Sequence, residues 1–263
     1  MSLDTVISGF IIFAEAVIVL LLIVKHVRRS FPVFFIFTCW TLISDVLLVS
    51  ILTLDPAIYF QSYEIELIVD SAMIFAVLVE LAWSVLRPIR SSLPRHSWIV
   101  IAVLIAVAGL LLWPIAGFTL PVQLTTAGMN FFRLQQTTAI LRVLVFLAMA
   151  GFSQLLSIGW RNRELQVATG MGLYSIVSLA VSVVHTHQIS GSPQYHLLDQ
   201  VQVASYSAAL VYWAVCFSTK EAERQEFTPQ MQNLLLAVAG AARSSRIGLS
   251  ESEASKRHNR REP

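Results

Sequence analysis

The stretch WIVIAVLIAVAGLLLWPIAGF, residues 98–118, contains no charged or strongly polar side chain. A helix needs about 20 mostly apolar residues to cross a bilayer, and this stretch supplies them without interruption. A helix that is apolar all round can face lipid on every side. We therefore expect residues 98–118 to form a membrane-spanning helix at the periphery of a larger domain.

The composition of the whole chain fits the same environment. Of its 263 residues, 56% are hydrophobic and only 13% are charged, and the mean hydropathy is +0.70. Soluble domains carry about 25% charged residues. Seven stretches are long and apolar enough to span a membrane, at roughly 5–25, 31–53, 64–87, 98–118, 131–157, 165–187 and 199–218. The sequence therefore predicts an all-α membrane protein, with a seven-transmembrane-helix bundle that occupies residues 1–218.

Lysine and arginine are distributed unequally between the two sets of loops. One set reads KHVRRS (25–30), RPIRSSLPRH (87–96) and GWRNRE (159–164). The loops at 54–63, 119–130 and 188–198 contain neither residue. Positively charged loops are retained on the cytoplasmic side of a membrane. We therefore expect the N-terminus outside the cytoplasm and the C-terminus inside it.

Residues 219–263 have the composition of a cytoplasmic tail. Thr228 and Pro229 suit the start of a helix, and apolar residues then recur on one helical face through Val238. We predict a short amphipathic helix at about 229–242 that lies on the membrane surface. A disordered basic end follows it.

Cysteine usage and glycosylation signals bear on localisation. Cys39 and Cys216 both fall inside predicted spans, and no N-x-[ST] sequence occurs. Without cysteines in the loops, no disulfide can brace them. Both features suit a bacterial inner membrane, and we expect a multi-pass protein of that membrane.

Six of the seven stretches carry polar side chains along one side, and several of these side chains are ionisable. A charge near the centre of a span costs about 2.5–3.5 kcal/mol of insertion free energy, so intramembrane charges usually belong to a site. The candidates for ligand binding or ion pairing are Arg142, Asp45, Asp70, Glu15, Glu80, Ser182, Gln202 and Tyr206. Six polar stripes and one bare helix predict a bundle with a shared hydrophilic interior.

Charge balance leaves two interpretations of these residues open. Arg142 can neutralise only one acid by pairing with Asp45, Asp70 or Glu15, so the others must meet water, bind a cation or take up a proton. This surplus favours a central binding site. The alternative is a buried ion pair that fixes helix packing, with the remaining acids in a small wet crevice.

Three histidines and one aspartate gather at the expected outer ends of the last two spans. His185, His187, His196 and Asp199 are residue types that bind zinc. They are the candidates for a metal site. The alternative is a set of interfacial histidines at a polar rim.

These features favour a non-enzymatic protein without a cofactor. We expect it to bind a small polar solute or ion within the bundle and to act as a membrane sensor. Besides the lipid bilayer, the expected partner is a cytoplasmic protein that meets the basic loops and the tail, and no nucleic acid. A small-solute or proton-coupled transporter is one alternative, for which the first three and last three helices would have to be a duplicated unit. A membrane-embedded metal-dependent hydrolase is another.

The loop asymmetry predicts that a fluorescent protein fused to the C-terminus will fluoresce, because it will stay in the cytoplasm. Alkaline phosphatase fused at the same place is expected to be inactive, since it folds only after export. Fusions at residue 190 provide the control, because the signs there should be reversed. An active phosphatase at the C-terminus would show that the orientation is wrong.

Overall fold

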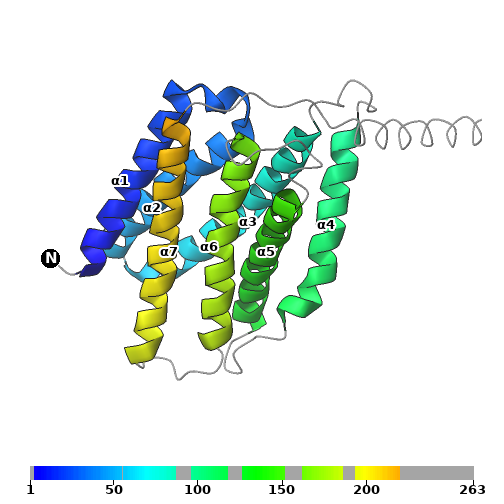
Figure 1. The fold of residues 1–263 in the computed structure, drawn as a ribbon. Coiled ribbons are helices and arrows are strands. Elements are labelled where there is room, and N and C mark those ends of the chain that lie inside the picture. The colour runs from blue at the N-terminus through cyan, green and yellow to red at the C-terminus, as the bar shows by residue number, and fades with distance from the viewer. Residues whose placement is uncertain are drawn as a thin grey trace, which may run out of the picture.

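The computed structural model describes residues 3–54, 56–86, 96–117, 126–151, 162–185 and 193–219. These ranges contain seven long α-helices and one short 3-10 helix, with no strand among them. The helices are α1 (Leu3–Val24), η1 (Val27–Arg29), α2 (Pro32–Leu54), α3 (Pro56–Val85), α4 (Ser97–Ala116), α5 (Thr126–Gly151), α6 (Arg163–His185) and α7 (Pro193–Ser218). The protein is a seven-helix bundle, as the sequence predicts (Figure 1).

Six of the seven helices are long and apolar enough to cross a membrane, which confirms a multi-pass membrane protein. The remaining helix, α3, carries four carboxylates, at Glu64, Glu66, Asp70 and Glu80. No other described helix carries as many. Where α3 lies in the bundle therefore decides where most of the intramembrane charge lies.

Six helices form a ring, and α4 lies outside it. Contacts lead from α1 to α2, α3, α5, α6, α7 and back to α1, and α3 also touches α6 across the ring. α4 packs against α3 and α5 at the edge of the bundle (Figure 1). On its outer side, Val100, Leu104, Leu110 and Leu111 are 68–73% exposed. This confirms the peripheral position expected for the helix without polar side chains.

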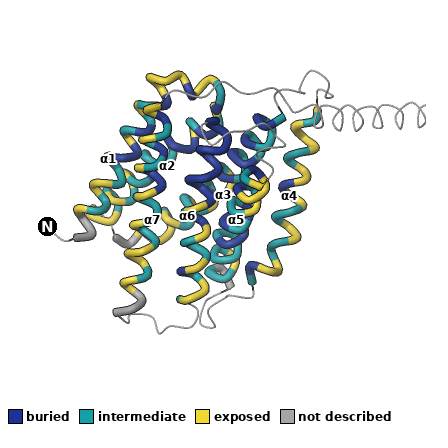
Figure 2. Tube along the Cα trace, in the orientation of Figure 1, coloured by how far each residue is buried: buried dark blue, intermediate teal, exposed yellow. Residues whose placement is uncertain are grey.

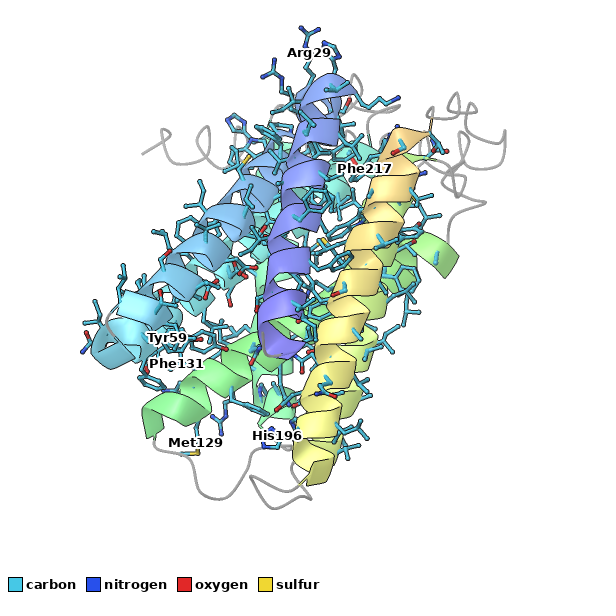
Figure 3. All side chains as sticks on the ribbon, turned by 90° about the vertical axis from the view of Figure 1, so that its left-hand side faces the viewer. Arg29, Tyr59, Met129, Phe131, His196 and Phe217 are labelled. Carbon is cyan, nitrogen blue, oxygen red and sulfur yellow. The ribbon has the colours of Figure 1, made fainter. Side chains whose placement is uncertain are left out.

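The two ends of the bundle differ in packing. We call the end that carries exposed Lys25, Arg28 and Arg29 the basic end. Arg29 and Phe217 lie toward this end in Figure 3, and Tyr59 and His196 lie toward the other. Buried residues gather in the half of the bundle near the basic end, whereas the opposite half is more exposed (Figure 2). The fully buried side chains there include Leu22, Phe31, Phe34, Leu78, Leu81, Leu165 and Phe217.

Several helices extend beyond the predicted spans. α3 begins at Pro56 instead of near 64, α5 begins at Thr126 instead of 131, and α7 begins at Pro193 instead of 199. Hydropathy locates the apolar part of a helix but not its polar ends, and proline is favoured at the first helical position. The predicted tail helix at 229–242 lies outside the described residues.

A close approach between α6 and α7 depends on Gly170. A Cβ at Gly170 would overlap the indole of Trp213. That indole is only 4% exposed, and its Nε1 donates to the main-chain oxygen of Gln166 at 3.2 Å. Because the ring is rigid and enclosed, it cannot easily move aside for a methyl group.

Replacement of Gly170 by alanine is therefore expected to lower the free energy of unfolding by about 1–3 kcal/mol. Gly9→Ala is the matched control, because no atom lies within 4 Å of where its Cβ would stand and alanine is favoured in helices by up to about 1 kcal/mol. Thermal unfolding of both purified variants in detergent measures the difference. Equal midpoints would mean that the α6–α7 contact is loose at this point.

Candidate functional site

A cavity of about 190 Å³ lies inside the ring of helices. Five charged side chains line it: Glu15 from α1, Asp45 from α2, Glu66 and Asp70 from α3, and Arg142 from α5. Polar and aromatic residues complete much of the wall, among them Thr38, Thr41, Ser71, Gln135, Thr138, Tyr174, Tyr206 and Trp213. No residue of α4 takes part. Three formal negative charges are thus left over when the four acids and the one base are ionised.

One wall of the cavity is a continuous row of four side chains. Glu15 is 2% exposed, and its Oε1 accepts a hydrogen bond from the hydroxyl of Tyr206 at 2.5 Å. The ring of Tyr206 meets the ring of Tyr174 edge-on, with centroids 5.3 Å apart. The guanidinium carbon of Arg142 lies 5.4 Å from the centroid of Tyr174, within the range of a cation–π contact. The row joins α1, α7, α6 and α5.

Arg142 is half-buried and has an unusual set of contacts for a base inside a helix bundle. Among the described residues, no carboxylate oxygen lies within 4.0 Å of its guanidinium, so the expected direct ion pair is not formed. Its Nε is buried and has no hydrogen-bond partner. Asp70 is the carboxylate whose charge interacts with it, and Asp70 also accepts a hydrogen bond from Nε1 of Trp40 at 3.1 Å.

The threonines in the wall present acceptors to the cavity. The hydroxyl of Thr38 donates to the main-chain oxygen of Phe34 at 3.1 Å, and that of Thr41 donates to the oxygen of Thr38 at 3.0 Å. On α5, Thr138 donates to the oxygen of Gln135 at 2.9 Å. Since each hydroxyl has one proton, what these groups retain for a ligand is their lone pairs.

Glu80, a predicted site residue, lies outside the cavity. Its two carboxylate oxygens accept hydrogen bonds from the main-chain nitrogens of Val33 and Phe34, each at 2.8 Å. These N–H groups belong to the first turn of α2, where no carbonyl within the helix can accept them. Glu80 therefore caps a neighbouring helix at the basic end.

Arg163 makes the complementary contact at the same end. Its guanidinium donates to the main-chain oxygens of Cys216 at 2.7 Å and Thr219 at 2.8 Å. It also donates to Oε1 of Gln166 at 3.0 Å and lies over the ring of Phe217. These carbonyls end α7, so a buried cation here satisfies the negative end of the helix.

Two further predicted site residues take other positions. Ser182 accepts a hydrogen bond from Nε2 of Gln136 at 2.6 Å, which ties α6 to α5. Gln202 is half-buried on α7, one turn before Tyr206, and does not line the cavity.

The described members of the predicted metal site, His185, His196 and Asp199, do not converge on one point. Nε2 of His185 lies 3.7 Å from Oδ1 of Asp199, while His196 is exposed. His187 lies outside the described residues. Within the part of the chain that the structure describes, no three His, Cys, Asp or Glu side chains are arranged to hold a metal ion.

Glu66 and Tyr174 line the cavity but are not among the predicted site residues. Glu66 shares the cavity face of α3 with Asp70, one turn away, so its spacing was a usable signal. Tyr174 lies one turn from the polar Ser178 on α6, but as an aromatic residue it does not stand out in an apolar helix.

Comparison of the chain with protein-family models, curated proteins and solved structures finds no match. Function is therefore inferred from the cavity itself.

Arg142→Met is expected to lower the free energy of unfolding by up to about 4 kcal/mol, because the cavity carboxylates lose a nearby base that lies beyond direct ion-pair distance. Adding Asp70→Asn should recover part of that loss, since Asp70 interacts with Arg142. Adding Glu64→Gln should not, because Glu64 does not line the cavity. Thermal unfolding of the parent protein, the three single variants and the two double variants in detergent gives the coupling free energies. Equal rescue by Asp45→Asn would contradict the assignment to Asp70.

Proposed function

We propose that this protein is a receptor-like membrane sensor that binds a small polar solute or ion in the central cavity and catalyses no reaction. The observation that carries the proposal is the cavity wall, in which four helices contribute five charged side chains. Each charge is costly inside a membrane. Among the described residues, Arg142 and Glu15 each retain a buried polar atom without a hydrogen-bond partner, which is typical of a site that a ligand completes.

The packing of the basic end supports a sensor over a carrier. A carrier must open its central site to each side of the membrane in turn. On the side toward the basic end, Phe34 packs edge-on against Trp213 and Phe217, with centroids 5.3 and 6.0 Å away. Glu80 and Arg163 tie helix ends together in the same region. Opening a path there would break partly buried charge-assisted hydrogen bonds, which are stronger than hydrogen bonds between neutral groups.

The surface of the basic end suits contact with a partner protein. Lys25, Arg28 and Arg29 are exposed there. With the N-terminus outside, this end faces the cytoplasm, and an acidic protein surface is the complementary partner.

The binding proposal predicts that one class of small solute stabilises the purified protein. At a concentration 100 times its dissociation constant, a ligand adds about 2.7 kcal/mol to the free energy of unfolding. We would measure thermal midpoints in nanodiscs with sodium, potassium, ammonium, alkylamines, amino acids and polyols. Asp45→Asn should abolish the shift because Asp45 lines the cavity, and Glu64→Gln should retain it.

The same solute, radiolabelled, separates sensor from carrier. Proteoliposomes that contain the protein are expected to bind it in a fixed ratio without accumulating it over time. Time-dependent uptake would make the protein a transporter. If no solute class shifts the midpoint, the binding proposal itself is wrong.

A further inference from the structure

We infer that the solute is a small dipolar molecule of the amino-acid type, with an ammonium group and a carboxylate. This inference rests on the binding function proposed above. It follows from the two kinds of unsatisfied group that the cavity brings together.

The first kind attracts a cationic donor. Asp45, Glu66 and Asp70 line one side of the cavity, and the hydroxyls of Thr38 and Thr41 offer only lone pairs beside them. An ammonium group carries three N–H donors and no acceptor, so it matches such a wall.

The second kind attracts an anionic acceptor. The guanidinium of Arg142 has five N–H donors, yet no described residue accepts a hydrogen bond from it. Tyr174 holds it through its ring face at 5.4 Å, which leaves the planar edge unoccupied. A carboxylate binds that edge through two parallel hydrogen bonds.

The side chains that line this cavity thus include one hydrogen-bond acceptor atom and one donor atom that lack a partner among the described residues. Within the described part of the chain, Oε2 of Glu15, on a side chain 2% exposed, has no donor, and Nε of Arg142 has no acceptor. A simple cation would leave Arg142 unsatisfied, and a simple anion would leave the acids unsatisfied. The volume of about 190 Å³ corresponds to about six water molecules, which restricts the ligand to a small molecule.

Alanine, ethylamine and propionate form a matched set of probes, since the last two lack the carboxylate and the amine of the first. We would titrate each into the full-length protein in nanodiscs and follow the thermal midpoint, with glycine and serine as further amino acids. An amino acid is expected to bind about 10- to 100-fold more tightly than ethylamine, because its carboxylate adds hydrogen bonds to the charged guanidinium of Arg142. Propionate should not bind.

Arg142→Lys tests the role of the guanidinium while keeping its charge. A lysine cannot form the two parallel hydrogen bonds, so amino-acid affinity should fall about tenfold or more, and ethylamine affinity should stay the same. Glu64→Gln is the control and should change neither.

Three results would overturn the inference. Ethylamine that binds as tightly as the amino acids would make the site a cation site, and propionate that binds alone would make it an anion site. Amino acids that fail to bind would also refute it. In each case the binding function stands if any other solute of the wider panel shifts the midpoint, and it falls only if none does.

Discussion

A carboxylate cannot face lipid without a large free-energy cost, and α3 carries four of them. This constraint explains why α3 has neighbours on so many sides, namely α2, α4, α5 and α6. Glu66 and Asp70 turn toward the cavity, and Glu80 turns toward the first turn of α2. The apolar α4 then covers the outer side and meets lipid itself. The acidic α3 is thus separated from lipid on its outer side by the apolar α4.

Charged groups serve in two different ways along the bundle. At the basic end, the carboxylate of Glu80 lies on the positive end of one helix and the guanidinium of Arg163 on the negative end of another, and both are well hydrogen-bonded. A buried charge with its hydrogen bonds satisfied holds a structure together. In the cavity, Arg142 and Glu15 each keep a buried atom for which the described residues provide no hydrogen-bond partner. The contrast between the two regions distinguishes charged side chains that hold helix ends from the charged side chains of the proposed binding site.

Much of this arrangement could be predicted from the sequence, because membrane insertion restricts it strongly. The number of helices and the peripheral place of residues 98–118 follow from apolar length and from the absence of polar groups. The shared interior follows from the polar stripes.

Sequence periodicity shows which residues lie on the same face of a helix, but it does not show which neighbouring helix each of those residues contacts. Glu66 and Glu80 share one face of α3, yet one lines the cavity and the other caps α2, and only the packed structure distinguishes them. In the same way, the polar stripes bring Arg142 to the shared interior, but the contact of its guanidinium with the ring of Tyr174 is seen only in the packed structure.

The proposed sensor needs a physical route from the cavity to the basic end, and Trp213 lies where such a route would begin. Its side chain lines the cavity and packs edge-on against Phe34, whose main-chain nitrogen is held by Glu80. Its Nε1 also donates to Gln166, and the side chain of Gln166 accepts a hydrogen bond from Arg163. Coupling between distant sites travels through contiguous packed and hydrogen-bonded groups that have alternative arrangements. Trp213 thus connects the cavity wall, through direct contacts, to both helix-end contacts, and the contact of Arg163 lies at the end of α7.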